Sequence, residues 1–244
     1  MGQDGAPQPT GGAGAPGTGL APNVAAALSY VPSPITGVIM YFLETNPFVR
    51  FHAWQSMFFG LTAIALSQVF SAIVGVLALV PFLGWLIAIL SWLLIGAGYS
   101  LVAFLVWLVL VVMAFQGSSF HLPVLGALAE RYAANDGPNA HGALAYVLGP
   151  ITGFVLLQRD RDPFVGFHAW QSIILFVAWI VVAIAMGIVL WPLSGFIYYI
   201  FDLARIIISL GFLYFWLTAL TKAGNGERFQ VPYVGPMAER YASR

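Results

Sequence analysis

The chain has 244 residues, of which 60% are hydrophobic and only 7% are charged. Soluble domains carry about 25% charged residues, so this composition excludes a protein whose surface faces water throughout. Nine basic and nine acidic residues leave no net charge, which excludes a nucleic-acid-binding protein, and the absence of cysteine excludes thiolate catalysis and zinc–sulfur sites. Residues 51–129 contain no Asp, Glu, Lys or Arg, a run long enough for several bilayer crossings of about 20 residues each. The sequence predicts an integral membrane protein.

The N-terminal segment differs from the rest of the chain. Residues 1–23 are rich in Gly, Pro and Ala and carry one charge, Asp4. Such a composition offers too little apolar side chain to offset the entropy of ordering, so we expect a disordered tail. No basic start and no apolar run precede Val24, so we do not expect a signal peptide.

The chain repeats itself. Two of the matching stretches recur after 116 residues and the third after 109. The second repeat is therefore seven residues shorter than the first between its second and third stretch. The matches are FHAWQS at 51–56 and 167–172, PITG at 34–37 and 150–153, and AERY at 129–132 and 238–241. We therefore expect a tandem duplication, with a first membrane repeat at 24–134, a polar linker at 135–141 and a second membrane repeat at 142–244.

Each repeat is expected to contain three apolar helices. Continuous apolar runs without alternation exclude a barrel and predict an all-α membrane bundle of about six transmembrane helices. The expected helices lie roughly at 24–43, 51–79, 83–115, 142–158, 166–190 and 195–221, separated by proline- and glycine-bearing turns.

The orientation follows from the odd number of crossings. Three spans per repeat turn the second repeat upside down, and the positive-inside rule then places both termini in the cytoplasm of a cell whose plasma membrane holds the chain. The alternative is that Pro32, Pro34 and Pro150 make the first segment of each repeat re-entrant, which leaves both repeats the same way up.

These motifs resemble a family of small bacterial and archaeal membrane proteins of unassigned function that is related to the chloroplast import component Tic-twenty. The first repeat matches the family pattern in PITG, FHAWQS, PFLGW at 81–85 and QG at 116–117, whereas the second has WPLSG at 191–195 and AG at 223–224 at the last two places. The resemblance implies a fused pair of family units. It also suggests a role in moving or inserting polypeptides, which is an analogy of fold.

The repeated hexapeptide supplies the main candidate site. His52, Gln55 and Ser56 share a helix face, as do their counterparts 116 residues later. One interpretation is a ligand, proton or peptide contact. The other is structural, with tryptophan at the headgroup level and His and Gln bonded to the preceding loop. The candidate residues are Phe51, His52, Trp54, Gln55, Ser56, Phe167, His168, Trp170, Gln171 and Ser172.

Asp202 and Arg205 are the only charges within an expected span, three residues apart on one helix. An ionisable residue in the membrane indicates a functional site with a partner, and here the pair is its own partner. The alternative is that the helix begins near Asp202, which would place the pair at the membrane surface.

We find no nucleophile–base pair, phosphate loop or metal-ligand set, so neither an enzyme nor a metal or cofactor is expected. The predicted function is a non-catalytic scaffold, an assembly or insertion factor, or an accessory subunit that contacts the lipid bilayer and other membrane protein subunits. The alternative is a small-solute or ion transporter or channel built from inverted repeats.

Overall fold

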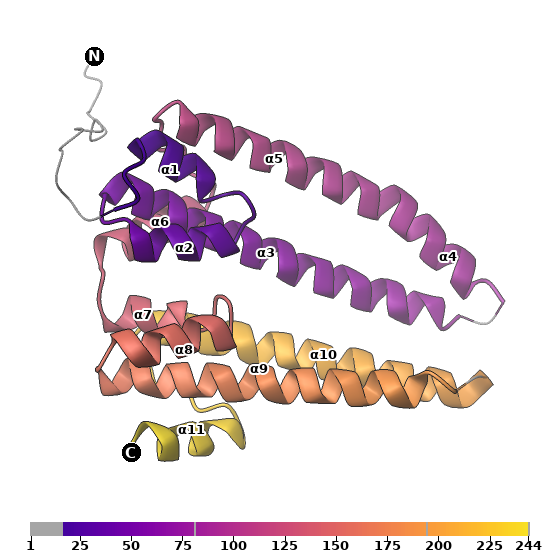
Figure 1. The fold of residues 1–244 in the computed structure, drawn as a ribbon. Coiled ribbons are helices and arrows are strands. Elements are labelled where there is room, and N and C mark those ends of the chain that lie inside the picture. The colour runs from indigo at the N-terminus through magenta and orange to yellow at the C-terminus, as the bar shows by residue number, and fades with distance from the viewer. Residues whose placement is uncertain (1–16, 81, 194, 244) are drawn as a thin grey trace. The chain divides into compact units, whose positions relative to one another are not determined.

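The computed structural model describes residues 17–80, 82–193 and 195–243, and within them it contains helices and no strand (Figure 1). Most of the expected N-terminal tail, residues 1–16, lies outside the described residues. The helices are α1 (Pro22–Leu28), α2 (Ile35–Leu43), α3 (Pro47–Ala78), α4 (Gly84–Ser91), a π-helical turn η1 (Trp92–Gly96), α5 (Ala97–Phe115), α6 (Leu125–Ala134), α7 (Pro138–Leu144), α8 (Pro150–Arg159), α9 (Pro163–Leu190), α10 (Gly195–Gly224) and α11 (Val234–Ala242).

Four of the described helical segments are long and apolar enough to cross a membrane. They are Pro47–Ala78, Gly84–Phe115, Pro163–Leu190 and Ile197–Gly224, and the second of them is made of α4, η1 and α5 without a break. The predicted all-α, multi-pass membrane protein is confirmed.

Of the six expected spans, four are present as single helices long and apolar enough to cross a membrane among the described residues. The stretches expected at 24–43 and 142–158 are each a pair of short helices, α1 with α2 and α7 with α8. Proline lacks a backbone N–H and cannot continue a helix, and Pro32, Pro34 and Pro150 lie where these pairs divide. The longest of the four, α8, has 10 residues and spans about 15 Å, half the thickness of the hydrocarbon core.

The chain divides into two compact units, and the first comprises residues 1–63 with 100–136. In this unit α1 packs on the later part of α5, where Ala26, Ala27, Leu110 and Ala114 form a buried cluster. The short helices α2 and α6 cover the beginning of α3, since Trp54 contacts both Tyr41 and Tyr132. The short helices of this unit therefore gather where α3 begins and α5 ends.

The second unit comprises residues 64–99 with 137–244. Here α7, α8 and α11 pack at the end where α9 begins and α10 finishes (Figure 1). Gly149 at the turn between α7 and α8 meets Phe176 of α9, and Trp170 stacks on Tyr241 of α11. Beyond Phe176 the side chains of α9 are largely exposed and apolar up to Trp191, as expected for contact with lipid.

The long helices of the two units begin and end with the same kinds of capping residue. The Asn46 side chain accepts from the Phe48 N–H at 2.9 Å, and the Asp162 side chain accepts from the Phe164 N–H at 2.7 Å, so each helix that carries the hexapeptide has a capped N-terminus. Gly117 and Gly226 follow α5 and α10 with φ of 79° and 80°, the left-handed conformation that glycine favours after a helix.

A pair of glycine substitutions tests the packing of α8 on α9. A Cβ at Gly153 of α8 would lie 2.9 Å from the Ala169 carbonyl oxygen, whereas a Cβ at Gly166 of α9 would meet nothing within 4 Å. We expect Gly153→Ala to lower the free energy of unfolding by about 1–2 kcal/mol through overpacking. Gly166→Ala should raise it by up to about 1 kcal/mol, because alanine favours a helix. Thermal unfolding in detergent measures both; equal effects would contradict the close packing.

Candidate functional site

The first hexapeptide forms a polar cluster with a tyrosine from outside it. The Tyr30 hydroxyl lies 3.0 Å from Nδ1 of His52 and accepts a hydrogen bond from Nε2 of Gln55, also at 3.0 Å. The Gln55 amide also donates to the Phe120 carbonyl at 2.9 Å and accepts from the Leu122 N–H at 3.1 Å. We call Tyr30, His52 and Gln55 the first clamp, because they tie the α1–α2 turn, α3 and the loop after α5 together.

The second hexapeptide makes the same contacts. The Tyr146 hydroxyl lies 3.0 Å from Nδ1 of His168 and accepts from Nε2 of Gln171 at 2.9 Å. Gln171 donates to the Phe229 carbonyl at 2.9 Å and accepts from the Val231 N–H at 3.0 Å. Tyr146, His168 and Gln171, the second clamp, join the α7–α8 turn, α9 and the loop after α10.

The direction of the hydrogen bonds fixes the proton on each histidine. A tyrosine hydroxyl that accepts from glutamine has its own proton left to donate, so Nδ1 of His52 and of His168 accepts and Nε2 carries the proton. Burial raises the pKa of Tyr30 and Tyr146 above the ordinary value, more than the glutamine hydrogen bonds lower it. Both phenols therefore stay protonated at neutral pH, as donation to histidine requires.

The last residue of each hexapeptide binds the same turn. The Ser172 hydroxyl donates to the Ala145 carbonyl at 2.7 Å, and the Ser56 hydroxyl donates to the Ser29 carbonyl. A tryptophan from the following long helix completes the arrangement, since the indole N–H of Trp107 and that of Trp216 each donate, at 2.8 Å, to the carbonyl of the clamp tyrosine. Two carbonyl groups of each turn are thereby paired with side-chain donors.

The remaining hexapeptide residues surround the clamps with apolar groups. The rings of Phe51 and Phe167 lie 5.0 and 4.9 Å from the histidine that follows each in the chain. Trp54 is fully buried, and its ring lies 4.8 Å from that of Tyr132. Trp170 is half-buried and stacks on Tyr241.

Four aromatic residues of the site were not among the predicted site residues. Tyr30 and Tyr146 are 116 residues apart, the spacing of the hexapeptides, and Trp107 and Trp216 are 109 apart, the spacing of the AERY stretches. A search at these two spacings restricted to aromatic residues finds all four. The backbone atoms that receive the glutamine amides carry no sequence signal, because any residue supplies them.

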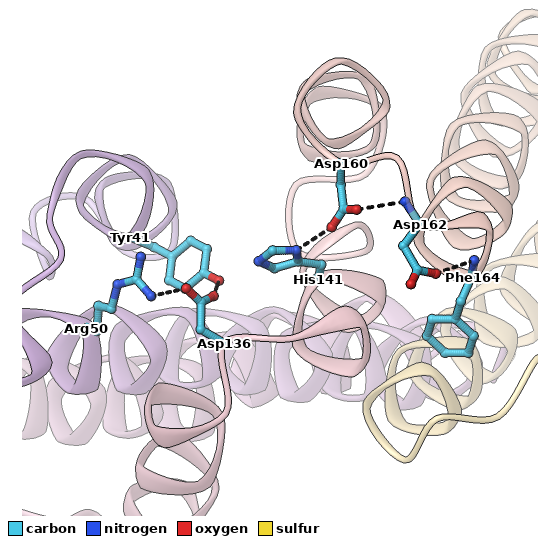
Figure 2. A network of polar contacts seen from close by, with 7 residues as sticks. All are labelled: Tyr41, Arg50, Asp136, His141, Asp160, Asp162 and Phe164. Carbon is cyan, nitrogen blue, oxygen red and sulfur yellow. Dashed lines mark hydrogen bonds and ion pairs between the residues drawn. The ribbon is translucent and has the colours of Figure 1, made fainter.

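Charged side chains gather at the capped ends of the two helices that carry the hexapeptides (Figure 2). In the first unit, Asp136 accepts from the Tyr41 hydroxyl and pairs with Arg50 in the first turn of α3. In the second unit, Asp160 pairs with His141 at 2.5 Å and accepts from the N–H of Asp162, the residue that caps α9. Each clamp thus lies at the charged end of its helix.

The Asp202–Arg205 pair lies inside α10, which begins at Gly195, so the helix does not begin near Asp202. The guanidinium donates to Oδ1 of Asp202 from Nε at 2.8 Å and from a terminal nitrogen at 2.7 Å. The carboxylate is buried, whereas the Arg205 side chain is 47% exposed. The structure therefore brings together the two charges that the sequence singled out.

The site offers hydrogen-bond donors that are enclosed by protein. Nε2 of His52 and of His168 are buried, and the backbone of Ser118 and of Glu227 lies close to the two rings. Across the part of the chain that the structure describes, no group of three or more His, Cys, Asp or Glu side chains converges to hold a metal ion. What the clamps do chemically is to fix one tautomer of each histidine and to join three backbone segments.

Comparison with known proteins identifies relatives about half as long as this chain. A UPF0132 membrane protein of Methanocaldococcus jannaschii is 37% identical over 120 residues, which are 48% of this chain and 79% of that protein. A second protein of that name from the same organism is 36% identical over 47% of this chain and 91% of its own length. One from Archaeoglobus fulgidus is 41% identical over 42% of this chain and 92% of its own.

A family described as the magnetosome magnetite crystal formation protein family matches residues 139–238, which contain the second clamp. No solved structure matches the chain. The matched relatives are archaeal membrane proteins, in keeping with the small prokaryotic membrane family that the motifs resemble. The chain belongs to the UPF0132 family of membrane proteins.

Proposed function

We propose that the protein is a non-catalytic membrane scaffold, which acts as an assembly or insertion factor or as an accessory subunit of a larger membrane complex. One observation carries the proposal: the glutamine and serine side chains of both hexapeptides form their hydrogen bonds within the chain. Gln55 and Gln171 each make three hydrogen bonds, two of them to loop backbone. A site that binds a solute would keep such groups for its ligand.

Two further findings support a tandem duplication. Each clamp repeats the other in its partners and, to within 0.1 Å, in its distances. The relatives are covered over 79–92% of their length by less than half of this chain. We infer that this protein joins two copies of a unit that its relatives carry once. By analogy with Tic-twenty, which the motifs resemble, we also propose a role in moving or inserting polypeptides.

We also propose that both copies insert the same way up, with four crossings and re-entrant α1–α2 and α7–α8 pairs. Two crossings per copy return the chain to its starting side. Eight of the nine basic residues then lie on the same side of the membrane, and the ninth, Arg205, lies within a span. The opposite loops, 79–83 and 191–194, carry no charge. The positive-inside rule places the charged side, with both termini, in the cytoplasm, and we assign the protein to the cell membrane.

Cysteine labelling tests this topology without background, because the chain has no cysteine. We expect Thr45→Cys and Asp160→Cys to react with an impermeant maleimide from the same side of sealed vesicles, and Trp191→Cys from the other side or not at all. Reaction of Thr45→Cys and Asp160→Cys from opposite sides would restore the inverted six-span arrangement and overturn the four-span topology.

The alternative function, a transporter or channel, is favoured by the buried carboxylate of Asp202 inside a candidate span. Proton and ion flux in proteoliposomes separates the two functions. A scaffold gives the flux of protein-free vesicles, and native mass spectrometry of the mildly solubilised protein shows a stoichiometric complex. Flux above the background that is lost in Asp202→Asn, from a protein without bound subunits, would overturn the scaffold in favour of the transporter.

A further inference from the structure

A cavity of about 280 Å³ lies within the second unit, where the later part of α3 meets the α9–α10 hairpin. The two parts pack closely there, since a Cβ at Gly75 of α3 would lie 2.8 Å from Cδ1 of Ile206 on α10. Three polar side chains line the cavity, Gln68 from α3 and Arg205 and Ser209 from α10, and the remaining wall is apolar and belongs mainly to α9. An apolar wall with a few convergent polar groups is typical of a small-molecule site.

The polar groups of this cavity lie deep in their helices. Helix α3 ends at Ala78 and α10 begins at Gly195, so Gln68 and Arg205 each lie ten residues, or about 15 Å, from the uncharged end of their helix. That distance is half of the hydrocarbon thickness of about 30 Å. A ligand of this cavity therefore needs a polar head that enters the hydrocarbon layer, which the headgroups of phospholipids do not do.

The polar side chains of the cavity retain groups for a ligand. Arg205 donates to Asp202 from Nε and from Nη2, and among the described residues no acceptor meets its Nη1. The side chains of Gln68 and Ser209 likewise make no hydrogen bond to any residue that the structure describes. The clamp glutamines, in contrast, form their bonds within the chain.

The charge of the site favours a neutral ligand that accepts hydrogen bonds. The Asp202 carboxylate already balances Arg205, so an ionic ligand would add an uncompensated charge inside the membrane, which is costly. The free N–H groups of Arg205 and Gln68 require acceptors. Trp179 also lines the cavity, and its stacking on Phe212 at 4.9 Å holds a flat indole there, which suits a flat ring.

The cavity opens to the lipid-facing surface. Val182 and Ile208 line it and are 39% and 41% exposed. Its volume lies just below the range of about 300–1,000 Å³ typical of pockets for drug-sized ligands, so it accommodates a ring and leaves an apolar tail outside.

We propose that this cavity binds the head of a lipid-soluble quinone. The ring carbonyls accept from Arg205 and Gln68, the ring lies against Trp179, and the apolar tail leaves between Val182 and Ile208 into the lipid. A quinone is neutral, flat and soluble in the hydrocarbon layer, and its only polar atoms are acceptors. Quinone binding goes beyond the scaffold function and does not depend on the orientation of the two repeats.

The test titrates decylubiquinone into the full chain in phosphatidylcholine nanodiscs and follows the quenching of tryptophan fluorescence. Quinone dissolved in the lipid quenches in proportion to its concentration, whereas bound quinone adds a saturable component. We expect saturation at one quinone per chain, together with a rise in the thermal unfolding temperature. Quenching without a saturable component would overturn the proposal.

A pair of alanine substitutions on α9 locates the site. Ala183 lines the cavity, and Ala183→Phe should remove the saturable component by filling the space. Ala185→Phe is the matched control, because Ala185 is exposed on the same helix and does not line this cavity, and it should bind as the parent does. Thermal unfolding without quinone checks that both variants fold. Binding that survives Ala183→Phe would place the quinone elsewhere and reject this site.

A third variant tests the polar contact without filling the cavity. Gln68→Leu breaks no hydrogen bond among the described residues, so it should fold as the parent does, and it should weaken quinone binding about three- to tenfold through the loss of one hydrogen bond. Unchanged affinity would contradict the assigned role of Gln68.

Two competitors separate a quinone from other lipids that carry acceptors. Dioleoylglycerol is neutral and presents ester carbonyls, whereas oleate is an anion, and we expect neither to displace decylubiquinone. Displacement by dioleoylglycerol would reassign the cavity to a neutral glycerolipid, and displacement by oleate would contradict the preference for a neutral ligand. The scaffold function is judged separately, by the native mass spectrometry described above, and survives a failure of quinone binding.

Discussion

Replacing Gln171 with leucine should lower the free energy of unfolding by about 3–5 kcal/mol. The substitution removes three hydrogen bonds at once and takes the donor from the part-buried Phe229 carbonyl and the acceptor from the buried Val231 N–H. Each such group costs about 1–3 kcal/mol. The Tyr146 hydroxyl also loses the donor that directs its own proton to His168. Thermal or denaturant unfolding in detergent, followed by near-ultraviolet circular dichroism, measures the loss.

The matched control for this substitution is Gln158→Leu on α8. Gln158 is exposed, so the same chemical change there should alter stability by less than about 0.5 kcal/mol. Gln55→Leu in the first clamp should behave like Gln171→Leu, because its three hydrogen bonds are the same. A loss below about 1 kcal/mol at Gln171 would contradict the clamp as a structural device and return the glutamine to the candidate ligand contacts.

The sequence predicts those residues of the site whose side chains recur at a fixed spacing. His52, Gln55 and Ser56 share a helix face, and the structure turns all three inward. Gln55 and Ser56 bind backbone atoms: the carbonyl of Phe120, the N–H of Leu122 and the carbonyl of Ser29. Such atoms are present at every residue, so only the folded chain reveals which of them meet the motif.

Two of the six expected spans are divided into short helices for a related reason. Hydropathy responds to apolar composition, and the stretches at 24–43 and 142–158 are as apolar as a crossing requires. Helix length is set instead by the breaks at Pro32, Pro34 and Pro150, beyond which the serine, threonine and tryptophan bonds hold the turns. The prolines were visible in the sequence, whereas the groups that stabilise a turn between them were not.

The distribution of charge across the membrane differs between the two topologies. In the six-span arrangement the basic residues divide between the two sides of the membrane, whereas in the four-span topology that we propose eight of the nine share one side. The charged clusters around Asp136 and Asp160 lie at the ends of α3 and α9 where those helices begin. Charged residues at one end of each hairpin can therefore fix its depth in the bilayer. The far turns carry no charge, and there Phe82 and Trp191 are 95% and 91% exposed.

Asp202→Asn should destabilise the protein more than the double variant Asp202→Asn with Arg205→Gln. The single change leaves the Arg205 guanidinium without the carboxylate oxygen that it now meets at 2.7 and 2.8 Å. An unpaired charge at the centre of a span costs about 2.5–3.5 kcal/mol, and Asp202 lies about 10 Å into α10, so we expect about 2–3 kcal/mol. The double variant carries no charge there and should lose less than about 1 kcal/mol.

The full cycle needs Arg205→Gln as its third member, measured by thermal unfolding both in detergent and in lipid nanodiscs. Arg205→Gln should destabilise as well, because it leaves the buried Asp202 carboxylate without its partner. The coupling between the two single changes should be larger in lipid than in detergent, since water reaches a micelle-embedded helix more easily. Small effects that add within about 0.5 kcal/mol in both media would mean that the pair lies in water. Strong coupling in lipid would place an ion pair inside the membrane in the second copy alone, because the first carries no charge between residues 51 and 129.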